Sequence, residues 1–154
     1  MPPKKIKKQE PQWTYEGSIV DDISKTPPDS IGFIYLIENL TNGKKYFGRK
    51  TFRVLNKKKK LTIAEKKLPG NSRKIFKYVE YEYKGWQDYN GSCEPLLEDI
   101  KKGDLFKKTI VKFCSKKKQL TAWELKFILC DCFLDENCYN GNIMGKIFKK
   151  DFQD

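Results

Sequence analysis

The segment FIYLIENLTNGKKYFGRK (33–50) constrains the fold more than any other part of the sequence. Two short runs rich in aromatic and β-branched residues flank the dipeptide Asn42-Gly43. Asn and Gly tolerate the positive φ angles that tight hairpin turns need. The pattern therefore predicts two antiparallel strands over 32–39 and 44–50.

Each of these strands carries one tyrosine, Tyr35 in the first and Tyr46 in the second. Cross-strand neighbours on one face of a hairpin lie about 4.5–5.5 Å apart, so the hairpin can bring the two rings together. An ordinary aromatic pair on a half-buried sheet fits this arrangement, and so does a paired chemical device.

Three further segments complete the predicted core. Residues 92–103 have helical periodicity, with Ser92 as the expected N-cap and Gly103 as the end. Residues 106–114 have the composition of a strand, and 120–134 are expected to form a helix with Thr121 as its N-cap. The sequence thus predicts an α+β fold with a small, mainly antiparallel three-stranded sheet flanked by helices.

The domain organisation expected from these elements is simple. A chain of 154 residues has room for one domain with a modest core. Residues 1–30 contain five prolines and a lysine cluster, which is typical of a basic, largely extended arm. The domain proper then spans 31–154, with a basic, aromatic-rich insertion over 51–91 in which 62–68 has the pattern of a short helix.

The charge balance points to a polyanionic partner. The chain holds 32 Lys and Arg against 20 Asp and Glu, a net charge of +12. A soluble protein with a general lysine bias is the alternative. Basic residues of the insertion are the candidate phosphate contacts, because such clusters release counterions from nucleic acid; they are Arg53, Lys57, Lys58, Lys59, Lys60 and Lys74.

The apolar runs and cysteines predict the compartment. No run approaches the ~18 apolar residues of a membrane span, so no membrane partner is expected. The first residues, MPPKKIKKQEPQW, lack the apolar core of a secretory signal. The number of cysteines, five, is odd, and the sequence contains no CxxC motif. Cys130 and Cys132 fit an apolar helix as small hydrophobic residues. Together these features predict a reduced, intracellular protein that is not secreted.

Histidine is absent from the sequence, which limits the possible chemistry. A zinc site is not expected, because Cys130-x-Cys132 is not a usual ligand spacing and no histidine can complete it. If the protein is an enzyme, its general base must be Tyr, Lys, Asp, Glu or a metal-bound water.

Two polar residues near the C-terminus have both a structural and a functional interpretation. Thr121-x-x-Glu124 is the pattern of a capping box, but Glu124 is also a carboxylate able to hold one Mg²⁺. Asn140 precedes Gly141 and fits a turn, but it is also a polar group able to orient a phosphate or the carboxylate.

In this order the residues resemble the GIY-YIG nuclease family. FIY (33–35) stands for the GIY motif and YFG (46–48) for the YIG motif, while Glu124 and Asn140 fall at the metal-binding glutamate and the terminal asparagine. The resemblance covers roughly 32–145, and WQDYNGS (86–92) further resembles free-standing, phage-type, homing-like members. Phe33 replaces the first glycine of GIY, and Phe47 replaces the isoleucine of YIG.

The resemblance implies Mg²⁺-dependent (or Mn²⁺-dependent) hydrolysis of DNA phosphodiesters. Glu124 would hold the metal, Asn140 would orient the site, and either Tyr46 or Tyr35 would take a proton from the attacking water. The family also has an arginine on a first helix soon after YIG, and the basic insertion obscures that helix here. The candidates for this phosphate clamp are Arg49, Lys50 and Arg73.

The main alternative is a non-catalytic nucleic-acid-binding module on the same scaffold. A nuclease of this kind is expected to act as a monomer or as a dimer induced by DNA. Homing, restriction and repair or DNA-degrading nucleases share this core, and the resemblance to phage-type members favours a free-standing homing-like nuclease.

Overall fold

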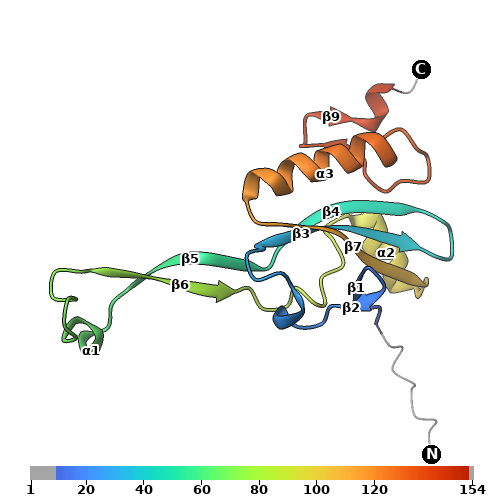
Figure 1. The fold of residues 1–154 in the computed structure, drawn as a ribbon. Coiled ribbons are helices and arrows are strands. Elements are labelled where there is room, and N and C mark those ends of the chain that lie inside the picture. Colours follow the sequence, from blue (N-terminus) through green and yellow to red (C-terminus); the bar gives the residue numbers. More distant parts are fainter. Residues whose placement is uncertain (1–9, 153–154) are drawn as a thin grey trace, which may run out of the picture.

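A five-stranded sheet in the order β2-β1-β7-β3-β4 forms the centre of the fold. The computed structural model describes residues 10–152 (Figure 1). The three predicted strands are β3 (Gly32–Asn39), β4 (Lys45–Thr51) and β7 (Phe106–Cys114), and β3 pairs antiparallel with both others. The mixed α+β fold with a mainly antiparallel sheet is therefore confirmed.

The prediction of three strands is wrong, because the N-terminal segment adds two more. β1 (Trp13–Tyr15) runs parallel to β7, and β2 (Ser18–Ile19) pairs antiparallel with β1. The Trp13 side chain anchors this addition: it is 1% exposed, and its indole N–H donates to the Trp86 carbonyl at 3.0 Å. Residues 13–19 thus belong to the folded domain, and not to an extended N-terminal arm as predicted. The first lysine cluster lies outside the described residues.

The two faces of the sheet carry different helices. Strand side chains alternate between faces, so Phe33, Tyr35 and Ile37 pack beneath Leu96 of α2 (Glu94–Lys102). Ile34 instead packs against Leu120 of α3 (Lys117–Asp131), on the other side of the sheet. The remaining elements are short: η1 (Ile23–Lys25), α1 (Ile63–Lys66), β8 (Asn142–Ile143), β9 (Ile147–Phe148) and η2 (Lys149–Phe152).

Both core helices begin at a different residue from the one predicted. Cys93, not Ser92, occupies the N-cap of α2, whereas Gly103 ends the helix as expected, with φ +95°. Helix α3 begins at Lys117, four residues before Thr121. The Thr121 hydroxyl donates to the Lys117 carbonyl within the helix, so the predicted capping box does not form and Glu124 lies about two turns from the helix start.

The insertion forms an arm that projects from the domain (Figure 1). Strands β5 (Arg53–Lys60) and β6 (Phe76–Glu82) pair antiparallel, and α1 lies at the tip between them. Thr62 and Glu65 form a capping box at the start of α1.

The C-terminal segment closes the free edge of β4. The Lys45 amide donates to the Asn137 carbonyl at 2.9 Å, and the Tyr139 amide donates to the Lys45 carbonyl at 2.7 Å. Cys132 and Cys138, whose Cα atoms are 5.4 Å apart, form a disulfide that fixes this segment to the end of α3. Cys130 is exposed, so the expectation that it packs as a small hydrophobic residue is wrong.

Within residues 10–152, no helix combines the length and apolar character needed to cross a membrane.

Candidate functional site

The β3–β4 register places the two tyrosines diagonally on one face of the sheet. Tyr35 lies opposite Gly48, and Tyr46 lies opposite Ile37. The ring centroids are 6.1 Å apart. The hairpin therefore brings the tyrosines into contact, although they are not directly opposite each other.

Gly48 makes room for the Tyr35 ring. A Cβ atom at Gly48 would lie 2.3 Å from Oη and 2.5 Å from Cζ of Tyr35. Since no side chain fits there, the glycine of YFG and the tyrosine of FIY form one packing unit. Tyr35 is 1% exposed, so it lies in the core rather than at the surface.

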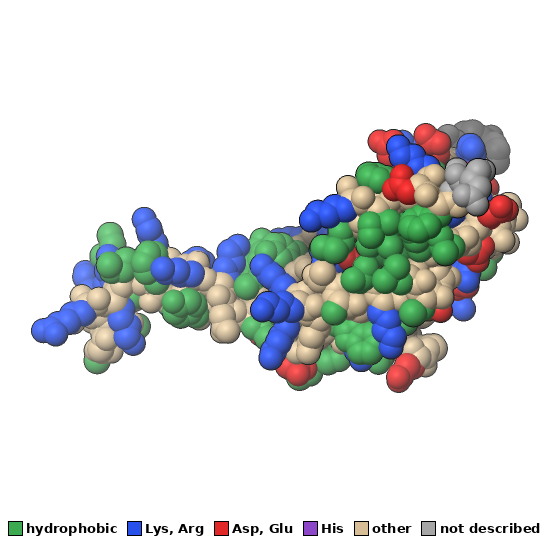
Figure 2. Space-filling model, turned by 90° about the horizontal axis from the view of Figure 1, so that it is seen from above, with side chains coloured by type: hydrophobic (Ala, Val, Ile, Leu, Met, Phe, Trp, Pro, Cys, Tyr) green, Lys and Arg blue, Asp and Glu red, His purple; other side chains and the backbone are tan. Residues whose placement is uncertain are grey.

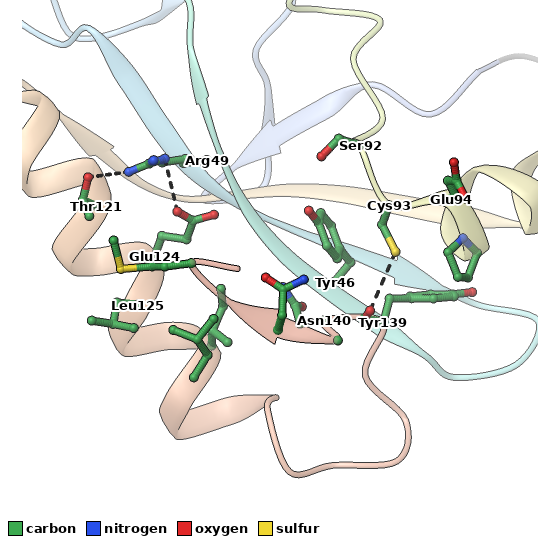
Figure 3. Close-up of a pocket in the computed structure, with 16 residues that line it drawn as sticks. Tyr46, Arg49, Ser92, Cys93, Glu94, Thr121, Glu124, Leu125, Tyr139 and Asn140 are labelled. Atoms are coloured by element: carbon green, nitrogen blue, oxygen red, sulfur yellow. Dashed lines mark hydrogen bonds and ion pairs between the residues drawn. The ribbon is translucent and has the colours of Figure 1, made fainter. Parts of the chain in front are cut away.

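A cavity of about 770 Å³ opens beside the edge of β4 (Figure 3). Its walls come from β4, from α3, from the start of α2 and from residues 139–144. Of the predicted catalytic residues, Tyr46, Arg49, Glu124 and Asn140 line this cavity. Segments that lie far apart in the sequence thus contribute polar side chains to a single concave surface.

Arg49 and Glu124 form an ion pair on the cavity wall. Arg49 Nε lies 3.2 Å from Glu124 Oε2, and Arg49 Nη1 also donates to the Thr121 hydroxyl (Figure 3). Burial raises the pKa of the Glu124 carboxyl, and the Arg49 guanidinium opposes that shift. Thr121 and Glu124 lie on one face of α3 because they are three residues apart, so this helix face positions Arg49.

Burial raises the pKa of both tyrosines above the ordinary value for a phenol. For Tyr46 the nearby Ser92 side chain acts on the pKa in the opposite direction. Tyr35 is the more deeply buried of the two, and it does not line the cavity. Neither side chain is a phenolate near neutral pH unless a cation stabilises that form.

Asn140 binds the backbone of β4 through both ends of its amide. Its Oδ1 accepts from the Phe47 amide at 2.9 Å, and its Nδ2 donates to the Phe47 carbonyl at 2.8 Å. Asn140 is 6% exposed. It therefore acts as a strand partner that fixes β4 between Tyr46 and Arg49.

Replacing Asn140 by aspartate is expected to destabilise the fold. Aspartate can still accept from the Phe47 amide, but its second oxygen then faces the Phe47 carbonyl without a proton to donate. We expect a loss of about 1–3 kcal/mol in the free energy of unfolding, measured by urea denaturation at pH 7. The matched control is Asn142→Asp at an exposed position of the same segment, and an equal loss in the control would contradict this role.

The other clamp candidates lie elsewhere. The Lys50 ammonium lies 4.1 Å from the centre of the Tyr89 ring, and Lys50 is not among the residues lining the cavity. Arg73 is exposed in the segment between α1 and β6, at the far end of the arm. Of the three clamp candidates, Arg49 is therefore the one that contacts Glu124 in the structure.

The candidate phosphate contacts separate into two groups. Lys57, Lys58, Lys59, Lys60 and Lys74 are exposed on the arm. Arg53 is 5% exposed instead, because its guanidinium binds the Thr26 hydroxyl, the Pro27 carbonyl and the Glu80 carboxylate at the base of the arm. Arg53 therefore holds the arm to the domain and does not belong to the exposed basic surface.

The sequence interpretation assigned no site role to three residues that the structure places at the site. Ser92 lines the cavity beside Tyr46, and Thr121 accepts a hydrogen bond from Arg49, but both had the pattern of helix caps. Tyr139 donates from its hydroxyl to Asp99 on α2 at 2.5 Å, which ties the segment around Asn140 to the domain. The only signal for Tyr139 is its place next to Asn140 in the sequence.

The structure thus holds the hairpin with its two tyrosines, with Glu124 on helix α3 and Asn140 after it, in the order on which the GIY-YIG resemblance was based, while Arg49 lies on strand β4 and not on a helix. The model of the family described as "Putative endonuclease segE, GIY-YIG domain" matches residues 13–144. The chain belongs to this GIY-YIG family, and the resemblance drawn from the sequence is confirmed. Neither the comparison with curated proteins nor the comparison with solved structures gave a match.

Proposed function

We propose that this protein is a metal-dependent DNA endonuclease that uses Mg²⁺ (or Mn²⁺) and hydrolyses phosphodiester bonds in the cavity beside β4. The observation that carries the proposal is the Arg49–Glu124 ion pair, which shares this cavity with Tyr46. Membership of an endonuclease family supports a nuclease role. A carboxylate, a guanidinium and a phenol are together sufficient for phosphoryl chemistry without histidine.

The residues present fit a magnesium ion held by one protein carboxylate. Glu124 is the acidic residue on the α3 side of the cavity, and its side chain is 25% exposed. No cluster of three His, Cys, Asp or Glu side chains suited to a metal occurs in the range 10–152. Mg²⁺ is commonly held by one or two carboxylates, with substrate phosphate and water completing its shell. When bound at Glu124, it would neutralise charge on the phosphate and the leaving oxygen.

Arg49 is the residue we assign to the phosphate. A guanidinium has five N–H donors, and Nε and Nη1 each make one contact with α3, which leaves donors for a phosphate. Because α3 fixes the guanidinium before substrate arrives, little side-chain freedom is lost on binding. Its planar fork matches two phosphate oxygens better than a lysine does.

Tyr46 is the residue we assign to the attacking water, since Tyr46 lines the cavity and Tyr35 does not. Burial raises the pKa of Tyr46, so its hydroxyl orients the water and accepts its proton only when nearby positive charge favours the phenolate. Tyr35 supports Tyr46 from within the core. Asn140 keeps the intervening strand in place.

The test is cleavage of supercoiled plasmid by the full-length protein. We expect cutting with Mg²⁺ or Mn²⁺ and none when EDTA is added in excess. The ratio of nicked to linear product also reports whether one strand or both are cut. Cutting that persists in EDTA would refute metal dependence, and folded protein that binds DNA but cuts with neither metal would favour the non-catalytic binding module.

A further inference from the structure

The net positive charge of the described chain is concentrated in the arm. The arm, residues 53–82, contains ten lysines and arginines and three glutamates, a net charge of +7. The rest of the described chain, 10–52 and 83–152, contains eighteen basic and sixteen acidic residues, a net charge of +2. Figure 2 shows the blue Lys and Arg side chains along the projecting arm, interleaved with apolar ones. The domain that holds the cavity is thus nearly neutral.

Both faces of the β5–β6 ribbon are basic. Lys57 pairs with Val79 and Lys59 with Lys77 on one face, while Lys58 pairs with Tyr78 and Lys60 with Phe76 on the other. The lysines also lie over aromatic rings: Lys57 Nζ is 3.6 Å from the centre of the Tyr81 ring, and Lys58 Nζ is 4.0 Å from that of Phe76. These contacts stiffen long side chains, so less freedom is lost when they bind phosphate.

We infer that the arm lies in the major groove of duplex DNA beside the cleavage site and supplies most of the binding energy of the proposed nuclease. The inference rests on the proposed function for the identity of the polyanion. A major groove about 12 Å wide admits a two-stranded ribbon, whereas a minor groove about 6 Å wide does not without distortion. Phosphates border both sides of the groove, which matches lysines on both faces of the ribbon.

The length of the arm sets how far from the cut it reaches. β5 has eight residues, which at ~3.4 Å each span roughly 27 Å. Since base pairs stack about 3.4 Å apart, the ribbon can cover about eight of them. The contacts of the arm therefore lie to one side of the scissile phosphate, and the footprint on DNA is asymmetric about the cut.

The experiment compares charge removal on the arm with charge removal on the domain. The arm variant replaces Lys57, Lys58, Lys59 and Lys60 by glutamine. The controls are Lys101→Gln with Lys102→Gln, and Lys146→Gln with Lys150→Gln, tested separately and combined. The combined control removes four exposed lysines elsewhere, as many as the arm variant does. Binding to a 30-base-pair duplex is measured by fluorescence anisotropy in EDTA, at several salt concentrations, so that no cleavage occurs.

We expect the arm variant to bind at least about 10-fold more weakly and to show a smaller slope of log K against log salt, by up to about 0.9 for each phosphate that the arm no longer neutralises. We expect each control to stay within about 2-fold of wild type. A hydroxyl-radical footprint should lose protection on one side only. Equal weakening in the arm variant and the controls, or a footprint that shortens on both sides, would overturn the inference.

Groove choice and substrate form are tested with the same assay. Methyl green, which occupies the major groove, should compete with wild-type protein, whereas netropsin, which occupies the minor groove, should not. The arm lysines should contribute less to binding of single-stranded DNA or of RNA, and an equal contribution would overturn a duplex groove as the partner.

The two proposals fail separately. An arm-dependent binder that never cuts DNA would contradict the nuclease and leave the arm inference standing. A protein that cuts DNA, and whose arm variant binds DNA as well as wild type does, would support the nuclease and contradict the arm inference.

Discussion

Replacing Glu124 by glutamine is expected to reduce plasmid cleavage by on the order of 10²–10³-fold, with DNA binding nearly unchanged. Glutamine keeps the size of the side chain but removes the charge that would hold Mg²⁺ and position Arg49. Because the partner Arg49 is 44% exposed, loss of the ion pair should cost at most about 1 kcal/mol of stability. The measurement is the initial cleavage rate at saturating Mg²⁺, together with the melting temperature.

The matched control for this prediction is Glu94→Gln. Glu94 lines the same cavity from the start of α2 but does not contact Arg49. We expect the control to cleave within a few-fold of wild type. If Glu124→Gln cleaves normally, or if Glu94→Gln loses as much activity, Glu124 is not the metal-holding residue.

Replacing Gly48 by alanine should cause a large loss of stability. The added Cβ would meet the Tyr35 ring at 2.3–2.5 Å, a distance at which something must move. Tyr35 is packed in the core beside Trp13 and Phe33, so its ring has no space to turn aside. Overpacking of a core costs about 1–3 kcal/mol, and we expect the upper end in urea denaturation.

The control for this substitution is Gly141→Ala. A Cβ at Gly141 meets no atom within 4 Å, and its backbone conformation is not in the left-handed region. The free energy of unfolding should therefore change little. Gly48→Ala should also reduce cleavage, because Tyr46 and Arg49 flank Gly48 on the same strand. A Gly48→Ala protein as stable as the Gly141→Ala control would contradict the packing described for Tyr35.

Local sequence signals predicted the hairpin and the presence of the two core helices, though not where the helices begin, because the causes of these elements are largely local. Gly43 takes the positive φ that the hairpin loop needs, and Gly103 ends α2 in the left-handed conformation that favours glycine. The order of Tyr35, Tyr46, Glu124 and Asn140 was sufficient to indicate the family. What these signals could not give was the register, which makes the tyrosines diagonal and places Gly48 beneath Tyr35.

The errors came from features that depend on distant or competing contacts. β1 has three residues, and its pairing with β7 depends on Trp13 entering a core built by other segments. The predicted Thr121 capping box does not form, because helix α3 begins earlier, at Lys117. Near this earlier start the Gln119 side chain accepts hydrogen bonds from the Ser115 amide and hydroxyl. The role of Asn140 as a strand partner requires the path of the chain after α3, which no local pattern predicts.

The lysines of the arm have a consequence for solubility as well. Within the part of the chain that the structure describes, β5 and β6 pair only with each other, so each has an outer edge. Exposed edges beside aromatic residues such as Tyr78 and Tyr81 are templates for edge-to-edge aggregation. Dense like charge opposes such pairing between copies. High salt, which screens that charge, should therefore promote self-association through the arm.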